Sequence, residues 1–227
     1  MNSYVVAEHF ASVNGEGQRA GAPAYFVRFA GCNLRCSYCD TAWAQKKDGA
    51  ESASFENLTT EQIVSLADAS GIIDVTLTGG EPLLQPGAEE VIIALQSGKL
   101  PHSVEIETNG SVDLAPFASL DKRPVFTMDY KLPGSGMESF MNKGNMKLLQ
   151  KQDSVKFVAS DQGDLDRALE IIEEYDLQNR CGVFISPVFG SLEPDRIVDL
   201  ILKHRLNGVR VGLQLHKFIW DPQKRGV

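Results

Sequence analysis

The sequence predicts an α/β fold in which parallel strands form an open sheet or an incomplete TIM-type barrel, within a single domain spanning residues 1–227. Strand-like runs recur along the chain, and amphipathic helical patterns lie between many of them, which is typical of a parallel sheet. There are about seven such runs, fewer than a closed eight-stranded barrel needs. They span residues 24–29, 75–78, 104–107, 125–129, 155–158, 183–185 and 209–211.

Three segments carry the clearest helical patterns. Thr59 and Gln62 have the spacing of a capping box, and an apolar stripe at helical intervals follows them. A second stripe covers residues 165–172 and a third covers 197–204. Asn207-Gly208 is expected to form the C-cap of the third helix, because glycine commonly ends helices.

Composition is typical of a soluble globular protein with one substantial core. The 227 residues are 43% hydrophobic and 23% charged. The formal net charge of -8 disfavours tight binding to a nucleic-acid backbone. No apolar stretch approaches the roughly 20 residues of a membrane span, and the first residues lack the pattern of a secretory signal peptide. We therefore expect a cytoplasmic protein that binds neither nucleic acid nor membrane.

Three cysteines on one short segment are the most informative feature for function. Cys32, Cys36 and Cys39 are spaced C-x3-C-x2-C, whereas the fourth cysteine, Cys181, is far away in the sequence. Three thiolates on one loop can bind three irons of a 4Fe-4S cluster. The fourth iron would then be open to a small molecule.

Other interpretations of these cysteines are possible. A disulfide framework would favour an even set of cysteines in a short secreted chain. A structural zinc site would need a fourth ligand, which His9 or Cys181 could supply by folding back. A redox C-x-x-C pair of Cys36 and Cys39 would leave Cys32 unexplained. The spacing favours the cluster over zinc, and zinc over redox chemistry.

Polar residues follow several of the predicted strands directly. Thr78 leads into Gly79-Gly-Glu-Pro82, the next strand ends in Glu107-Thr-Asn-Gly110, and another ends in Asp129-Tyr-Lys131. One glycine-rich cluster would be read as a turn. Several polar strand ends together predict a site, because the carboxyl ends of barrel strands are where such folds place their chemistry.

Tyr38, just before the third cysteine, makes the motif resemble the signature of the radical S-adenosylmethionine (SAM) superfamily. Thr78-Gly-Gly-Glu-Pro82 resembles the motif in which that superfamily brings glycine backbone close to the SAM amino group. The resemblance implies a 4Fe-4S cluster whose open iron binds SAM. It also implies SAM contacts from Tyr38, Cys39, Asp40, Gly80, Glu107, Asn109, Asp129, Tyr130, Lys131 and Ser186.

Local motifs narrow the choice within the superfamily. Asn14-Gly-Glu-Gly17, Arg28-Phe-Ala-Gly-Cys32, Cys39-Asp-Thr41 and Gln214-Leu-His216 together resemble the 7-carboxy-7-deazaguanine synthase family, over about residues 5–220. The resemblance implies conversion of 6-carboxy-5,6,7,8-tetrahydropterin to 7-carboxy-7-deazaguanine with loss of ammonia, in the pathway to queuosine. It also implies magnesium, and a hydrogen taken from pterin C6 that later returns to regenerate SAM.

The family resemblance gives the remaining residues expected roles. Arg28 has a planar fork suited to the substrate carboxylate, and Glu16 can accept from the pterin N–H groups. Thr41 would bind Mg²⁺, with Asp40 as the rival ligand. Many relatives have Gln in place of Asn14, so its contact could be made by backbone or by side chain. The predicted substrate contacts are Val13, Asn14, Gly15, Glu16, Arg28, Thr78, Gln214 and His216.

Two competing functions follow from the same sequence. An activase of glycyl-radical enzymes would share the cluster spacing but act on a protein, and the motifs around Glu16, Thr41 and His216 disfavour it. A zinc-stabilised binding module would have no catalysis. The resemblance further implies a reductant such as flavodoxin or ferredoxin and a homodimer. The tail after Trp220 extends past some shorter relatives and receives no role.

Overall fold

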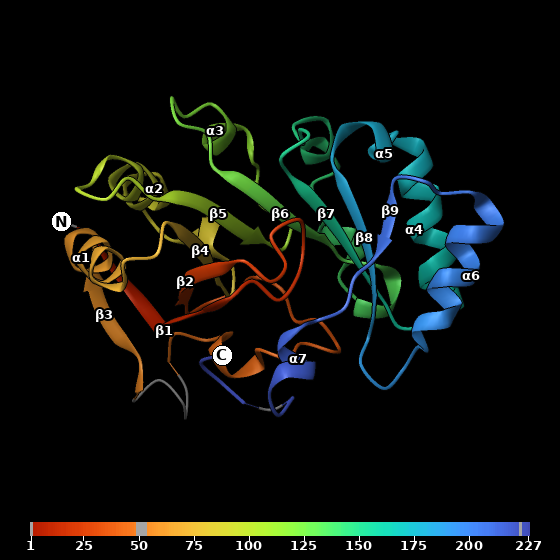
Figure 1. Cartoon of the computed structure of the whole chain (residues 1–227), viewed down its shortest axis with the longest axis horizontal. Helices are drawn as coiled ribbons and strands as arrows, with labels where there is room; N and C mark the ends of the chain where they lie inside the picture. The colour runs from red at the N-terminus through yellow and green to blue at the C-terminus, as the bar shows by residue number, and fades with distance from the viewer. Residues whose placement is uncertain (1, 49–53, 223) are drawn as a thin grey trace.

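The predicted parallel strands form one continuous sheet. The computed structural model describes residues 2–48, 54–222 and 224–227, and in this part of the chain nine strands lie in the order β3-β1-β2-β4-β5-β6-β7-β8-β9 (Figure 1). The strands β2 and β4 to β9 are parallel and coincide with the seven predicted runs. They are β2 (Pro23–Phe29), β4 (Asp74–Gly79), β5 (Ser103–Thr108), β6 (Val125–Tyr130), β7 (Ser154–Ala159), β8 (Gly182–Pro187) and β9 (Val209–Val211).

Two antiparallel strands extend one edge of this sheet. β1 (Ser3–Val13) pairs with β2, and β3 (Glu56–Thr59) pairs with β1. Neither was among the seven predicted runs. β3 is short and runs directly into a helix, so it has no apolar run of its own for the sequence to reveal.

The helices flank the two halves of the sheet. In Figure 1, α1, α2 and α3 lie beside one half and α4, α5 and α6 beside the other, while α7 and the C-terminus lie near β1. Their bounds are α1 (Thr60–Ser70), α2 (Ala88–Ser97), α3 (Ala115–Ala118), α4 (Gln162–Glu174), α5 (Leu177–Arg180), α6 (Pro194–His204) and α7 (His216–Ile219).

The predicted helix signals are confirmed in part. Thr59 and Gln62 form the capping box of α1, and the second and third apolar stripes lie on α4 and α6. The predicted C-cap of α6 is wrong. The helix ends at His204, and its C-cap is Arg205, whose backbone is left-handed with φ 52°.

A large apolar core fills the space between helices and sheet. Ile63 of α1 and Val91 of α2 pack in the same buried cluster as Leu77 and Ile106 of the sheet. Cys181 is also buried in this cluster, as the sequence predicts. Complete burial of side chains of this size contributes about 1.5–3 kcal/mol each and holds the strand ends in fixed positions.

The β1–β2 loop closes the barrel interior from the amino ends of the strands. Gln18 Nε2 donates to the carbonyls of Lys151 and Asp153, at the entry to β7. Arg19 donates to Asp74 and Ser103, the first residues of β4 and β5, at 2.8 Å each. The loop therefore covers the interior at this end of the strands.

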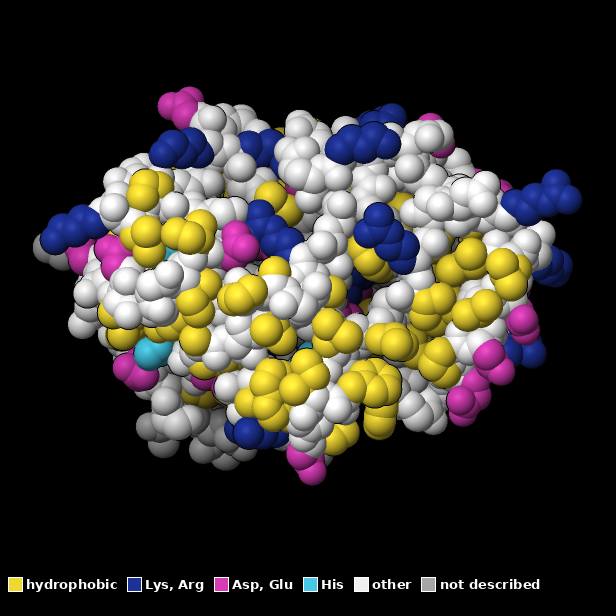
Figure 2. Space-filling view, in the orientation of Figure 1, with side chains coloured by type: hydrophobic (Ala, Val, Ile, Leu, Met, Phe, Trp, Pro, Cys, Tyr) yellow, Lys and Arg dark blue, Asp and Glu magenta, His cyan; other side chains and the backbone are white. Residues whose placement is uncertain are grey.

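Hydrophobic side chains gather on the face shown in Figure 2, over α7 and around α6. Exposed apolar residues there include Phe218 and Ile219 of α7 and Val198 and Leu202 of α6. In the described ranges, no helix is both long enough and apolar enough to cross a membrane.

Candidate active site

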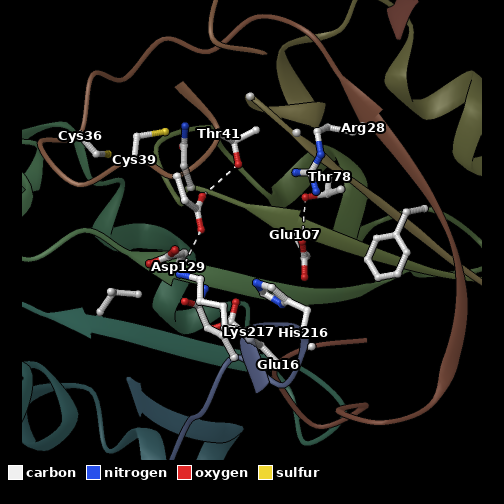
Figure 3. A pocket seen from close by; sticks show the side chains of 18 of the residues that line it. Glu16, Arg28, Cys36, Cys39, Thr41, Thr78, Glu107, Asp129, His216 and Lys217 are labelled. Carbon is white, nitrogen blue, oxygen red and sulfur yellow. Dashed lines mark hydrogen bonds and ion pairs between the residues drawn. The ribbon is translucent and has the colours of Figure 1, made fainter. Parts of the chain in front are cut away.

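A cleft of about 720 Å³ lies at the carboxyl ends of the parallel strands. Its lining brings together segments that are far apart in the sequence: the β1–β2 loop, the cysteine loop, the ends of β4 to β8 and residues after β9 (Figure 3). The predicted site residues line it except for three: Asn14, Tyr130 and Ser186. The clustering predicted from polar strand ends is therefore what the fold produces.

The cysteine loop follows β2 and is fixed at several points. Backbone bonds of the Ser37 N–H to Ser135 O and of the Cys32 N–H to Gln45 O hold it on two sides. The Tyr38 hydroxyl donates to the Val158 carbonyl on β7 at 3.0 Å. Tyr38 therefore anchors the loop across the cleft.

Cys32, Cys36 and Cys39 are half-buried free thiols that all face the cleft, whereas Cys181 is buried elsewhere. Burial raises the pKa of the Cys32 thiol, against hydrogen bonds from Leu34 N–H at 3.4 Å and from the Asn109 amide at 3.6 Å. Such N–H donors to sulfur are what a cluster thiolate needs around it. The donor set therefore fits an iron–sulfur cluster held by three cysteines.

Gly80 lies where β4 meets the cysteine loop, and its backbone allows close contact with that loop. A Cβ at Gly80 would overlap the carbonyl of Gly31, the residue before Cys32. Glu81 N–H also donates to Gly31 O at 2.9 Å. Gly80 lines the cleft as predicted, and a side chain there would have to displace the Gly31 backbone beside Cys32.

Glu81 holds the end of β5 in place, a role that the sequence did not reveal. Its side chain is fully buried and accepts from the Thr108 hydroxyl at 2.9 Å and the Asn109 N–H at 2.6 Å. Burial raises the pKa of Glu81 to about 7, although these hydrogen bonds oppose the shift. Glu81 therefore positions Asn109, whose amide reaches Cys32.

The ends of β5 and β6 carry the predicted acidic and basic side chains into the cleft (Figure 3). Glu107 accepts from the Thr78 hydroxyl at 2.7 Å. Asp129 Oδ2 pairs with Lys131 Nζ at 2.8 Å, while Asp129 Oδ1 is buried without a protein partner in the described residues. This orphaned oxygen can accept a hydrogen bond from a ligand.

Glu16, on the β1–β2 loop, lies at the floor of the cleft. Its Oε2 accepts from Lys156 Nζ of β7 at 2.7 Å. Lys156 was not predicted as a site residue. A lysine inside the apolar run 155–158 could have indicated one, because strands of parallel sheets are normally buried on both faces.

Arg28 and His216 lie on opposite walls above this floor. Arg28 Nε donates to Glu8 Oε1 at 2.7 Å. Burial lowers the pKa of His216, so its imidazole is neutral near pH 7. Gly15 packs directly on that ring, because a Cβ there would come within 2.5 Å of His216 Nδ1.

Thr41 and Asp40 lie next to each other at the cleft rim. The Thr41 hydroxyl donates to Asp40 Oδ1 at 3.0 Å, and Lys217 Nζ lies 3.8 Å from Asp40 Oδ2. Lys217 and Thr41 hold the pKa of Asp40 below its usual value. Both residues offer oxygens to a hard cation such as Mg²⁺, which binds through few protein ligands.

Three predicted contacts do not face the cleft. Asn14 is buried, its Oδ1 accepts from Thr76 at 3.0 Å, and its backbone groups are bonded within the loop. The Tyr130 hydroxyl points to Glu138, away from the cleft. Ser186 is buried near the end of β8, one residue before Pro187, which does line the cleft.

The C-terminal tail, which received no role from the sequence, forms part of the cleft rim. Lys224 to Val227 line the cleft, and the Arg225 guanidinium lies 4.2 Å from the ring centroid of Trp43. The sequence of this tail has no periodic pattern from which its position could be predicted. Its position follows from that of α7, which precedes it.

Comparison with known proteins agrees with this geometry. A family model described as the Radical SAM superfamily matches residues 26–131. A 7-carboxy-7-deazaguanine synthase of Clostridium acetobutylicum is 48% identical over 225 residues, which cover 99% of this chain and 100% of that protein. This chain belongs to the 7-carboxy-7-deazaguanine synthase family. A second protein of that name, from Leptospira interrogans, is 38% identical over 98% of this chain and 97% of its own length.

Solved structures support the fold of a synthase-family member. The crystal structure of QueE from Escherichia coli has a TM-score of 0.67 and 20% identity, covering 93% of this chain and 94% of that chain. SuiB of Streptococcus suis bound to S-adenosylmethionine has a TM-score of 0.55 over 84% of this chain and 52% of that one. The predicted incomplete barrel is confirmed. The zinc-module and activase interpretations are wrong, since the chain belongs to the synthase family.

Proposed function

We propose that this chain converts 6-carboxy-5,6,7,8-tetrahydropterin to 7-carboxy-7-deazaguanine, with loss of ammonia. It is a radical SAM lyase that uses a 4Fe-4S cluster, SAM and Mg²⁺. The observation that supports this most directly is that the three cysteines share one cleft with Glu16, Arg28, Thr41 and His216. One enclosed site can therefore hold the cofactors and a small heterocycle side by side.

Cys32, Cys36 and Cys39 would hold the cluster at one end of the cleft. When bound with SAM, the cluster supplies the radical chemistry that no amino-acid side chain can provide. The protein contributes a rigid loop, N–H donors to sulfur and shielding from water. Glu81 supports this arrangement from behind by fixing Asn109.

The SAM-binding residues would be those at the ends of β4, β5 and β6. Glu107 and Asp129 carry carboxylates suited to hydroxyl and amino groups of a ligand, and the orphaned Asp129 Oδ1 is one such acceptor. Lys131 balances the Asp129 charge. Gly79 and Gly80 bring backbone to the cleft wall without side chains in the way.

The substrate would bind between Arg28, His216 and the floor formed by Glu16. In the described part of the chain, the terminal nitrogens of Arg28 make no protein hydrogen bond, so its fork can bind the substrate carboxylate. Neutral His216 can donate to or accept from the heterocycle. Thr41 would bind Mg²⁺ beside that carboxylate, with waters completing the coordination.

Product analysis tests this function. The anaerobically reconstituted enzyme is incubated with SAM, Mg²⁺, a reductant and the carboxypterin, and the mixture is analysed by mass spectrometry and an ammonia assay. We expect the mass of 7-carboxy-7-deazaguanine and one ammonia per product. Cys36→Ala is the matched control and should give neither. Cleavage of SAM without either product in the parent protein would contradict the proposal.

We further propose that a flavodoxin or ferredoxin supplies the electron, that the protein is cytoplasmic and that it forms a homodimer. The exposed apolar residues of α6 and α7 are consistent with an interface. Light scattering on the reconstituted enzyme tests the dimer, and a mass near 24.9 kDa would contradict it.

A further inference from the structure

A buried ion pair crosses the floor of the cleft. Lys156 lies midway along β7, and Glu16 comes from the β1–β2 loop, 140 residues away. Their side chains are 8% and 12% exposed, and Nζ and Oε2 are 2.7 Å apart. Both residues line the cleft, so a ligand that reaches the floor meets this pair.

The pair leaves one carboxylate oxygen free. Glu16 Oε1 is buried and has no protein hydrogen bond in the described residues, while Oε2 is taken by Lys156. An ionised carboxylate only accepts hydrogen bonds, whereas a protonated acid or an amide could also donate. A ligand that binds at the floor must therefore donate a hydrogen bond to this free oxygen.

Lys156 remains an ammonium in this setting. Burial alone would lower its pKa, but Glu16, Asp129 and Glu107 outweigh that effect and raise the pKa of Lys156. Its hydrogen bond directs one oxygen of Glu16 to β7 and leaves the other for a ligand.

A purely structural role is a poor explanation for this pair. The β1–β2 loop is already anchored by Gln18 on two carbonyls and by Arg19 on Asp74 and Ser103. A buried ion pair gains little net stability over apolar residues of the same volume. The effect of Lys156 on the carboxylate is a better explanation for a lysine at this position.

We propose that Lys156 is a positioning residue that makes Glu16 a strict acceptor for the amine-bearing edge of the substrate heterocycle. This inference rests on the proposed function, which supplies a ring with adjacent N–H groups. An analogue with oxygen in place of the exocyclic amine would set an oxygen against the carboxylate. Sites built to pair with an N–H reject analogues that lack it, because a buried charge is left unpaired.

Binding measurements without reductant test the proposal, because no turnover then occurs. Cluster-loaded enzyme with SAM is titrated by calorimetry with the carboxypterin and with its 2-oxo analogue. The variants are Lys156→Met, Lys156→Arg, Glu16→Gln and the double variant Lys156→Met/Glu16→Gln. Lys151→Met, an exposed lysine just before β7, is the matched control.

We expect Lys156→Met to weaken carboxypterin binding at least tenfold and to reduce the preference over the 2-oxo analogue, with SAM affinity and iron content unchanged. Lys156→Arg should restore part of the loss, and the double variant should bind no more weakly than Glu16→Gln, since the two residues act as one unit. Lys151→Met should match the parent.

A loss smaller than tenfold in Lys156→Met, or effects that multiply in the double variant, would overturn the inference. If Lys156→Met does not fold, the double variant decides, because it leaves no unpaired buried charge: retention of the parental preference for the amine would overturn the inference. A parent protein that does not bind the carboxypterin at all would instead overturn the proposed function.

Discussion

Charged residues in the cleft are arranged as neighbouring opposite pairs. Lys156 pairs with Glu16, Lys131 with Asp129, and Arg28 with Glu8, at 2.7–2.8 Å. Each pair keeps a buried charge compensated while one partner still presents free atoms to a ligand. This arrangement suits SAM and a carboxypterin, which both carry charges of their own.

The magnesium site gives a prediction at this scale. Thr41→Ala should reduce the response of turnover to Mg²⁺ more than it reduces SAM binding, because only the hydroxyl ligand is lost. Product formation is measured across a magnesium titration after chelator treatment, and SAM affinity by calorimetry. Asp40→Asn is the matched variant. Superimposable titration curves for Thr41→Ala and the parent would mean that Thr41 is not a magnesium ligand and that Asp40 is the candidate.

Much of the site could be predicted from short motifs, because the residue types and spacing within a motif indicate which ligands it can bind. The three cysteines, Thr41, Glu107 and Asp129 all face the cleft as expected. Lys156 and Glu81 were not predicted, since their roles depend on partners more than 20 residues away. Asn14 was predicted to contact the substrate, but its side chain is buried outside the cleft. A short motif does not determine the direction of a loop side chain.

Among the secondary-structure elements, the end of β4 packs directly against the backbone that leads into the cysteine loop. The Gly79–Gly80 segment lies against Phe29 and Gly31, and no side chain fits between them. The seven parallel strands followed from their hydrophobic runs. The two antiparallel edge strands did not, because pairing partners and not local pattern define them.

Gly80→Val tests this contact. The added Cβ would overlap the Gly31 carbonyl next to Cys32, so the variant should lose cluster assembly as well as SAM binding. Iron and sulfide content after reconstitution measures the first effect. Gly98→Val, where a Cβ meets only ordinary contacts, should keep the parental iron content. Normal cluster content in Gly80→Val would show that the loop can move away.

Glu105 on β5 gives a second prediction for the elements. It is buried, accepts from Thr127, and burial raises its pKa from 4.5 to about 7. The folded state therefore binds this proton more tightly, so the contribution of Glu105 to stability is fully present below pH 4.5 and is lost as the pH rises through about 7. Glu105→Gln should remove this loss. Between pH 5 and pH 8, the free energy of unfolding should fall by about 2 kcal/mol more in the parent than in Glu105→Gln.

Urea unfolding of the apoprotein at the two pH values measures this difference. Glu193→Gln, on the surface, is the matched control. Equal pH dependence in the parent and in Glu105→Gln would mean that Glu105 ionises as readily in the folded as in the unfolded chain.

At the scale of the whole molecule, the β1–β2 loop covers the amino ends of the parallel strands, and the cleft lies at their carboxyl ends. α7 and the C-terminal tail line this cleft, where Lys217 and Arg225 approach Asp40 and Trp43. The sequence predicted the incomplete barrel but not the position of the tail, since the tail carries no periodic pattern. The cofactor end and the floor are parts of one cavity.

That shared cavity makes the central claim directly measurable. Carboxypterin with deuterium at C6 is incubated with the reconstituted enzyme, SAM, Mg²⁺ and reductant, and both the product and the recovered SAM are analysed by mass spectrometry. We predict that product forms and that the recovered SAM carries deuterium. We also predict that less SAM is consumed than product is formed. Product formation with unlabelled SAM, or no product at all, would contradict hydrogen transfer between the two ligands in this cleft.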